Sequence, residues 1–233
     1  EELYDCQADP QNLKNLASSS AYHDVLERMR AQLQERIHAS RDLGFLPEAL
    51  AWKLSEGSTP YELARSSSGA YDQSRLVNAA SQVGLGTSED FLVNLKHHDP
   101  GVRFWGAVGF SAAKSLSSKA IDSLTDALSD DIANVRIEAA NALARHGHTG
   151  KSIPILAAAL EEENLAAVQH AARAIELLGE KAKAALPAVA ACDVRMKAIR
   201  PPGTSPIVVD PDKDKAMFVT FSTEAFLKQF GSN

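Results

Sequence analysis

The sequence predicts an all-α fold of stacked helix pairs, and three observations carry this prediction. Alanine is abundant, with 38 of 233 residues, and 24 of these lie between Ala107 and Ala191. Apolar residues recur at every third or fourth position, as on one buried helix face. The chain also matches itself at a shift of 33 residues. Small residues at repeated positions indicate helices that pack closely against their neighbours.

Composition excludes several classes of protein. The chain has 24 Lys and Arg and 30 Asp and Glu, which gives a net charge of −6. This negative charge disfavours nucleic-acid binding. No stretch approaches the roughly 18 to 20 apolar residues of a membrane span. Hydrophobic residues make up 45%, enough for a core. Cys6 and Cys192 are too few for a disulfide framework, and we expect two free thiols.

The front of the chain reads as a polar, turn-rich segment followed by helices. Residues 1–19 offer only Leu3 and Tyr4 as an extended piece, whereas residues 22–40 form a one-faced helix that Gly44 and Pro47 end. Short helices are expected at 47–54 and at 60–65, where Thr59 is the N-cap and Pro60 the first helical residue. A Ser/Gly linker at 66–69 follows. The apolar face of the first helix comprises Val25, Leu26, Met29, Leu33 and Ile37.

Beyond the linker, the 33-residue shift aligns residues 99–103, 132–136 and 165–169. Helices at about 72–83 and 88–96 start the array, the second capped by Thr87 or Ser88. The helices that precede the aligned turns also repeat, at a shift of 32, so the unit is a helix pair. The aligned positions are Val102, Val135 and Val168, then Gly106, Ala139 and Ala172, then Gly109, Ala142 and Ile175.

The last repeat departs from the period. Its first helix is expected at about 184–199, but a helix resumes only at 217–230, so we interpret 200–213 as an insertion. A terminal repeat has no further neighbour to cover its face. We therefore expect aromatic residues to cap this end of the stack, namely Phe218, Phe221, Phe226 and Phe230.

Residues Asp99-Pro100-Gly101-Val102-Arg103, followed by an Ala-rich helix, resemble the turn of HEAT repeats in the short form of phycobilisome lyase-type proteins. The resemblance covers residues 72–230. It implies a right-handed alpha-alpha superhelix, a HEAT-like or ARM-like solenoid. At the turns, Arg103 or Arg136 is expected to reach acidic groups such as Asp99, Asp130 or Asp131.

Residues 2–17, ELYDCQADPQNLKNLA, resemble the segment E-L-Y-D-L-x-x-D-P-x-E-x-x-N-L-A near the C-terminus of formylglycine-dependent sulfatases, with Cys6 and Asn12 as departures. The resemblance implies that residues 1–65 are a sulfatase C-terminal-like tail, a strand remnant plus helices. It also implies a chain cut from a longer bacterial protein, periplasmic or extracellular. We expect residues 1–19 to be poorly ordered or misplaced in the isolated chain, because a single strand from a missing sheet has no ladder partner.

The sequence predicts no catalytic residues in this chain. Sulfatases need Cys/Ser-x-Pro-x-Arg, whereas residues 58–62 end in Glu62 and residues 152–156 end in Leu156. Both segments favour helix caps followed by proline, and neither cysteine is followed by the required Pro and Arg. No Gly-rich phosphate loop or nucleophile elbow is present.

We also expect no metal site and no cofactor. His97-His98-Asp99 reads as a solvated turn, because adjacent ring side chains on a helix point apart. His146-Gly147-His148 fits a helix C-terminus, where histidine suits the dipole and glycine the turn. Trp105 is expected between helices. The acidic runs 130–131 and 161–163 read as exposed charges, with a smaller chance of contributing to a binding face.

Two functions from different classes remain. In the first, the chain is a non-catalytic interaction scaffold that binds a protein partner or its own preceding catalytic domain. In the second, it is an accessory part of an intact sulfatase and helps to form the substrate entrance for sulfate-ester hydrolysis. DNA binding of the kind that some HEAT-like glycosylases show is a third possibility, which the negative charge opposes.

Overall fold

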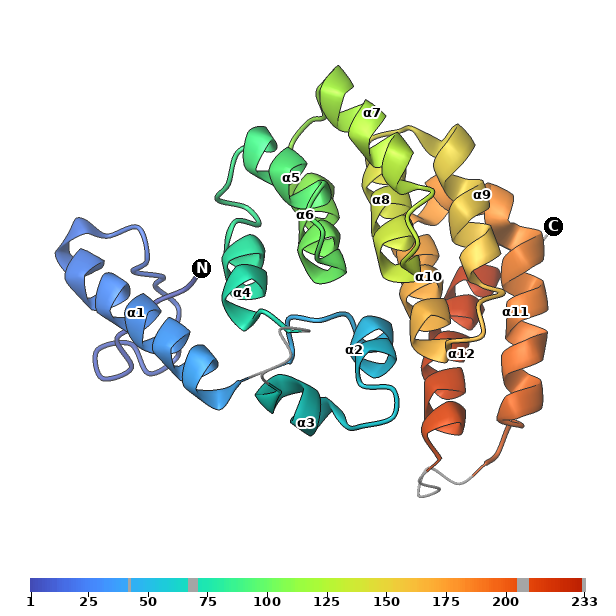
Figure 1. Cartoon of the computed structure of the whole chain (residues 1–233), viewed down its shortest axis with the longest axis horizontal. Coiled ribbons are helices and arrows are strands. Elements are labelled where there is room, and N and C mark those ends of the chain that lie inside the picture. The colour runs from blue at the N-terminus through green and yellow to red at the C-terminus, as the bar shows by residue number, and fades with distance from the viewer. Residues whose placement is uncertain (42, 67–70, 205–209, 232–233) are drawn as a thin grey trace. The chain divides into compact units, whose positions relative to one another are not determined.

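The computed structural model describes residues 1–41, 43–66, 71–204 and 210–231, and within these ranges all regular structure is helical (Figure 1). The chain divides into two compact units, Glu1–Asp42 and Leu43–Asn233. The prediction of an all-α fold is confirmed. The Ser/Gly linker falls mostly at 67–70, outside the described residues.

The first unit holds the 3-10 turn η1 (Ser20–Tyr22) and helix α1 (His23–Ser40). Its small core consists of Leu3, Leu16 and Leu26. The Leu16 N–H donates to the Leu3 carbonyl at 2.7 Å, and the Leu3 N–H donates to Asn15 Oδ1 at 3.0 Å. The segment thus supplies hydrogen-bond partners of its own in place of a sheet.

Helix α1 has the predicted apolar face, but the unit covers little of it. Leu26 is buried, whereas Met29 is 51% and Leu33 61% exposed. The helix ends at Ser40, before Gly44, because Arg41 adopts the left-handed conformation with φ of 53°.

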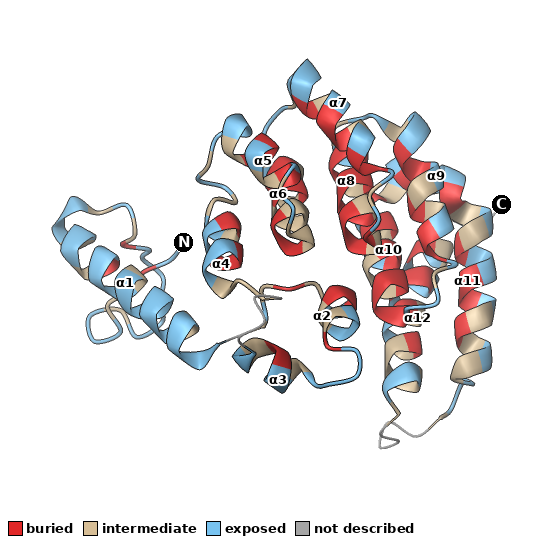
Figure 2. Ribbon diagram, viewed as in Figure 1, coloured by how far each residue is buried: buried red, intermediate tan, exposed pale blue. Residues whose placement is uncertain are grey.

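The second unit is an α-solenoid, in which α4 (Gln73–Ser81) precedes four stacked helix pairs (Figure 1). The second helices of successive pairs pack side by side. Figure 2 shows that the faces turned toward neighbouring helices are buried. The pairs are α5 (Ser88–Leu95) with α6 (Pro100–Ala112), α7 (Ser118–Ala127) with α8 (Ala133–Arg145), α9 (Thr149–Ala159) with α10 (Leu165–Leu178), and α11 (Leu186–Ile199) with α12 (Pro211–Phe230).

The repeated small residues lie where helices meet. Val135, Val168 and Ala139 are fully buried. At Gly106, an added Cβ would lie 2.6 Å from the Leu95 backbone nitrogen, so only glycine allows α5 and α6 to approach this closely. The sequence period thus marks the helix contacts, as predicted.

The last pair differs in detail from the sequence-based expectation. A 3-10 turn, η2 (Gly179–Ala185), precedes α11, and α12 already begins at Pro211 behind the N-cap Asp210. The expected insertion 200–213 is therefore shorter at its end, and its residues 205–209 lie outside the described part. Only Phe226 is buried and Phe230 half-buried; Phe218 and Phe221 are 47% and 58% exposed and do not cover the end of the stack.

Helices α2 (Glu48–Leu54) and α3 (Pro60–Arg65) form where predicted. We expected the boundary between the two parts at 65–72, but contacts divide the chain between residues 42 and 43. The reason is hydrophobic burial: Leu46, Leu50 and Leu63 belong to the core of the solenoid unit. Helices α2 and α3 therefore belong to the same compact unit as the repeats.

Candidate interaction surface

The turn before α6 is held by Asp99 and Arg103. Asp99 caps the helix by accepting hydrogen bonds from the backbone N–H groups of Gly101 and Val102. The Arg103 guanidinium forms a two-pronged ion pair with Asp130, at 2.7 and 2.9 Å, and also reaches Asp131 at 2.9 Å. The predicted contact of Arg103 with acidic groups of the next turn is confirmed.

The same connection recurs one repeat later. Arg136 donates to the Asp130 carbonyl at 2.7 Å and pairs with the Glu162 carboxylate. Asp130 and Glu162 are thus partners of partly buried arginine side chains, and not simply exposed charges as the sequence suggested. Glu161 and Glu163 are exposed, as expected.

This pairing affects protonation at the turn. Burial acts to raise the pKa of Asp130, but hydrogen bonds from Arg103 and from the Ile132 backbone N–H outweigh it, so the pKa is lowered. The hydrogen bond from Asp130 in turn raises the pKa of Arg103, against the opposing effect of burial. Both groups are held in their charged forms, which keeps successive turns tied together.

Residues 43–54 cover part of the surface that α6, α8 and α10 share. Trp105 Nε1 donates to the Phe45 carbonyl at 2.7 Å, so Trp105 packs against this segment and not between repeat helices as predicted. A Cβ on Gly101 would lie 3.0 Å from the Leu46 side chain. The chain's own segment thus occupies a face that the sequence left available for a partner.

A polar cluster lies on the same helices, and the sequence analysis missed it. Glu138 is only 6% exposed and accepts hydrogen bonds from Ser111 and from Asn141, the latter at 3.2 Å. His170 Nε2 lies 3.0 Å from the Glu138 carboxylate, and Asn134 Nδ2 lies 3.3 Å from His170 Nδ1. In the sequence, the one sign of this cluster is Glu138, a charged residue in an alanine-rich helix.

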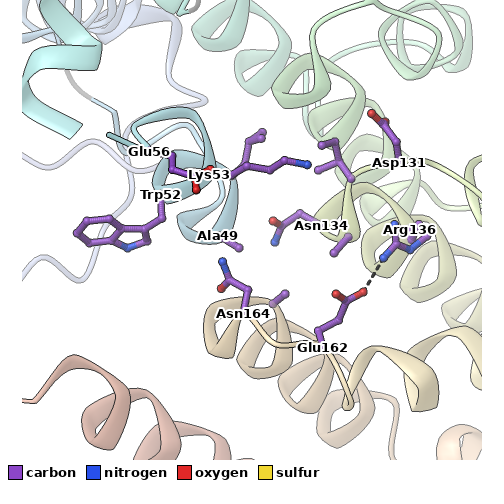
Figure 3. Close-up of a pocket in the computed structure, with 13 residues that line it drawn as sticks. Ala49, Trp52, Lys53, Glu56, Asp131, Asn134, Arg136, Glu162 and Asn164 are labelled. Atoms are coloured by element: carbon purple, nitrogen blue, oxygen red, sulfur yellow. Dashed lines mark hydrogen bonds and ion pairs between the residues drawn. The ribbon is translucent and has the colours of Figure 1, made fainter. Parts of the chain in front are cut away.

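Beside this cluster, an open hollow of about 410 Å³ lies between α2 and the N-terminal ends of α8 and α10 (Figure 3). Its charged and amide side chains come from three separate segments of the chain. The Arg136–Glu162 ion pair forms part of the wall. The labelled lining residues include Trp52, Lys53, Glu56, Asp131, Asn134 and Asn164.

The two serine-proline segments both have structural roles. Thr59 caps α3 by accepting from the Glu62 backbone N–H, and the Glu62 carboxylate accepts from the Ser58 and Thr59 hydroxyls. The cap prediction for Ser152 is wrong, because this residue lies inside α9. It is buried, and its hydroxyl donates to the His148 carbonyl at 2.7 Å.

The histidine pairs likewise belong to turns. His97 Nδ1 accepts from the Asp99 backbone N–H at 3.0 Å, and burial, followed by the charges of His98 and Arg75, lowers the His97 pKa. His146 is the C-cap of α8, and the following Gly147 has φ of 90°, as predicted for a helix end. Within the described ranges, no three His, Cys, Asp or Glu side chains are grouped to hold a metal ion.

Two further expectations concern cysteines and membranes. Cys6 is exposed and Cys192 is buried, and both are free thiols, as predicted. Burial raises the pKa of Cys192. Among the described residues, none of the helices combines the length and apolar character needed to span a membrane.

Comparison with known proteins agrees with the helical geometry. Residues 121–199, from α7 to α11, match the family of HEAT repeats, so the second unit contains HEAT-like repeats. The chain is also 44% identical over 59 residues to an ulvan-active sulfatase of Formosa agariphila. That match covers 25% of this chain and 10% of the relative's length. No solved structure matches the chain.

Proposed function

We propose that this chain is a non-catalytic helical-repeat scaffold from the C-terminal part of a sulfatase-like protein. The observation that carries the proposal is the presence, in one chain, of HEAT-like repeats and of a 59-residue stretch that is 44% identical to a sulfatase. The sequence of residues 2–17 supports the same origin. Cys/Ser-x-Pro-x-Arg does not occur anywhere in the 233 residues, so the chemistry would belong to another part of the protein.

The contacts indicate how the repeats would be attached. The solenoid core includes Leu46, which lies just before α2, Leu50 of α2 and Leu63 of α3. Burial of three leucines contributes roughly 5 to 8 kcal/mol, so this connection is an integral part of the repeat unit and not a free linker. A solenoid to which the preceding segment is anchored in this way can present its surface to a catalytic domain or to a protein partner.

Two measurements test the proposal. The reading frame that encodes the chain should contain Cys/Ser-x-Pro-x-Arg upstream of residue 1, and its absence there would remove the link to sulfatases. The isolated chain should not hydrolyse an aryl sulfate. Turnover that copurifies with the chain through two chromatographic steps would contradict a non-catalytic role.

The second candidate function is favoured by the ulvan-active relative: the repeats line the substrate entrance of an intact sulfatase. In that case, a Lys53→Glu substitution in the full-length protein should change KM for a polymeric sulfate ester and leave turnover of a small aryl sulfate unchanged. Equal effects on both substrates would argue against an entrance role. An unchanged KM for the polymer would favour the scaffold.

A further inference from the structure

We propose that Trp52 and the two hollows beside it form a binding groove for a saccharide chain that carries few anionic groups. The groove lies wholly within the solenoid unit, between α2 and the N-terminal ends of α8, α10 and α12. The inference goes beyond the scaffold role and does not depend on it.

Trp52 is a large aromatic side chain held in place at the surface. It is 51% exposed, although it lies on a helix whose Ala49 and Leu50 are buried. Its Nε1 donates to Glu48 Oε1 at 3.3 Å, and Lys215 Nζ lies 5.7 Å from the ring centroid. Lys215 also pairs with Glu48 at 3.3 Å, so both contacts fix the indole. A held, half-exposed indole offers an apolar platform at little cost in side-chain entropy.

The indole lies between two hollows. The first, of about 410 Å³, is bounded by α2 and the starts of α8 and α10. The second, of about 360 Å³, is bounded by α2, the start of α10 and the start of α12. Trp52 and Asn164 line both hollows, so these form one groove with the tryptophan at its middle. Figure 3 shows the Trp52 ring extending away from α8 and α10 and Lys53 reaching across the first hollow.

The groove has hydrogen-bonding capacity that the protein does not use. Asn134 is only 3% exposed and points into the first hollow, and its Oδ1 accepts no hydrogen bond from the described residues (Figure 3). Asn164 Oδ1 accepts from the Ala166 N–H at 3.0 Å, which leaves its Nδ2 as a donor. Lys53 and Glu56 line the same hollow and have no ion-pair partner within the described ranges. One amide acceptor, two donors and a carboxylate therefore line the space.

The charges select the kind of ligand. Arg136 is paired with Glu162, and Asp131 with Arg103. The charged side chains of the groove that have no ion-pair partner among the described residues are one cation and three anions, namely Lys53, Glu56, Glu163 and Asp212. This excess of carboxylates repels a polyanion such as a highly sulfated chain. Lys53 in turn projects its ammonium into the space that a cationic peptide would need.

A saccharide satisfies these groups together. Its hydroxyls both donate and accept, so they can bind an amide, an ammonium and a carboxylate in turn, whereas the C–H face of a pyranose ring is apolar and can lie on an indole. Successive sugar units on either side of the Trp52 platform would then occupy the two hollows. Lys53 could accept a single anionic substituent on one of these units.

Affinity electrophoresis of the whole chain, in native gels containing laminarin, xylan, galactomannan or dextran sulfate, tests the inference. We expect at least one of the three neutral polysaccharides to retard the chain. Trp52→Ala should weaken that binding about tenfold, a loss typical of an anchoring aromatic side chain. Glu56→Gln, which keeps shape and removes one acceptor charge, should weaken it by a smaller factor. Tyr61→Ala is the matched control, because Tyr61 is 67% exposed on α3 and lines neither hollow of the groove.

Thermal unfolding of each variant confirms that the fold is intact, since Trp52 and Glu56 lie outside the buried core. The inference is overturned if no neutral polysaccharide retards the chain, or if Trp52→Ala and Tyr61→Ala behave alike. Retardation by dextran sulfate alone, abolished by salt, would also overturn it. None of these results depends on sulfatase turnover or on the upstream sequence, so a failure here is distinct from a failure of the proposed scaffold role.

Discussion

Replacing Gly106 by alanine should destabilise the solenoid unit, although the sequence repeat suggests the opposite. The equivalent positions one and two repeats later are Ala139 and Ala172, and alanine in a helix interior is favoured over glycine by about 1 kcal/mol. Sequence reasoning alone would therefore predict a stabilising substitution.

The structure reverses the sign. A Cβ at residue 106 would lie 2.6 Å from the Leu95 nitrogen, 3.0 Å from the Leu95 Cα and 3.0 Å from the Phe91 carbonyl oxygen. Carbon contacts are optimal at about 3.5 to 4.0 Å, so α5 would have to move by about 1 Å. All three atoms are backbone, and no rotamer change relieves the clash. Overpacking of this kind costs about 1 to 3 kcal/mol. Against a gain in helix propensity of about 1 kcal/mol, this leaves a net loss of up to about 2 kcal/mol.

Urea unfolding followed by circular dichroism measures this difference, and the melting temperature should fall in parallel by up to about 8 °C. Gly150→Ala is the matched control: Gly150 lies in α9, where an added Cβ meets no atom within 4 Å, so this substitution should stabilise by about 0.5 to 1 kcal/mol. If Gly106→Ala stabilises the chain as much as Gly150→Ala does, the argument from close helix approach is refuted.

Three further predictions concern the turns and the thiols. Arg103→Met should lower the free energy of unfolding by about 1 to 3 kcal/mol, because the Asp130 side chain is only 11% exposed and loses its ion pair. A loss of less than a few tenths of a kcal/mol in a denaturant titration would count against this prediction. Since the pKa of Asp130 is lowered in the folded state, its stabilisation is present above the unfolded pKa and is lost as the pH falls below about 4. The wild-type chain should therefore lose stability on acidification more steeply than Asp130→Asn, and parallel curves would contradict this. A thiol reagent at neutral pH should modify exposed Cys6 at once and buried Cys192, whose pKa is raised, only after unfolding; two fast thiols in the native chain would disprove the burial.

Much of the fold followed from local sequence. Thr59 caps the helix that it was expected to cap, and of the two expected caps Thr87 and Ser88 it is Thr87 that does so. Asp99, which was not predicted as a cap, precedes Pro100 in the first helical position. These interactions form within one turn, so neighbouring residues determine them. The 33-residue period likewise marked Val135 and Val168 as buried, because a repeated pattern reports a repeated contact.

The candidate groove could not be predicted in the same way. It joins side chains from residues 52–56, 131–136 and 162–167, and only packing of α2 on the repeats brings them together. Because of the same packing, Trp105 does not pack between repeat helices, as expected, but donates a hydrogen bond to the Phe45 carbonyl. The polar group of Glu138 and His170 spans two repeats and interrupts a run of alanines, so no periodic pattern marked it.

The sequence by itself determined the helices, their pairing and the small residues at their contacts, because caps, turns and periodic apolar faces act over a few residues. Only the tertiary structure decided what covers the shared surface of α6, α8 and α10. That outcome depends on burial of Leu46 and Leu50 against residues far along the chain, and the free energy of such burial is set by the shape of the surface and not by the local sequence. The place of Trp52, at the surface between two hollows, follows from this same burial.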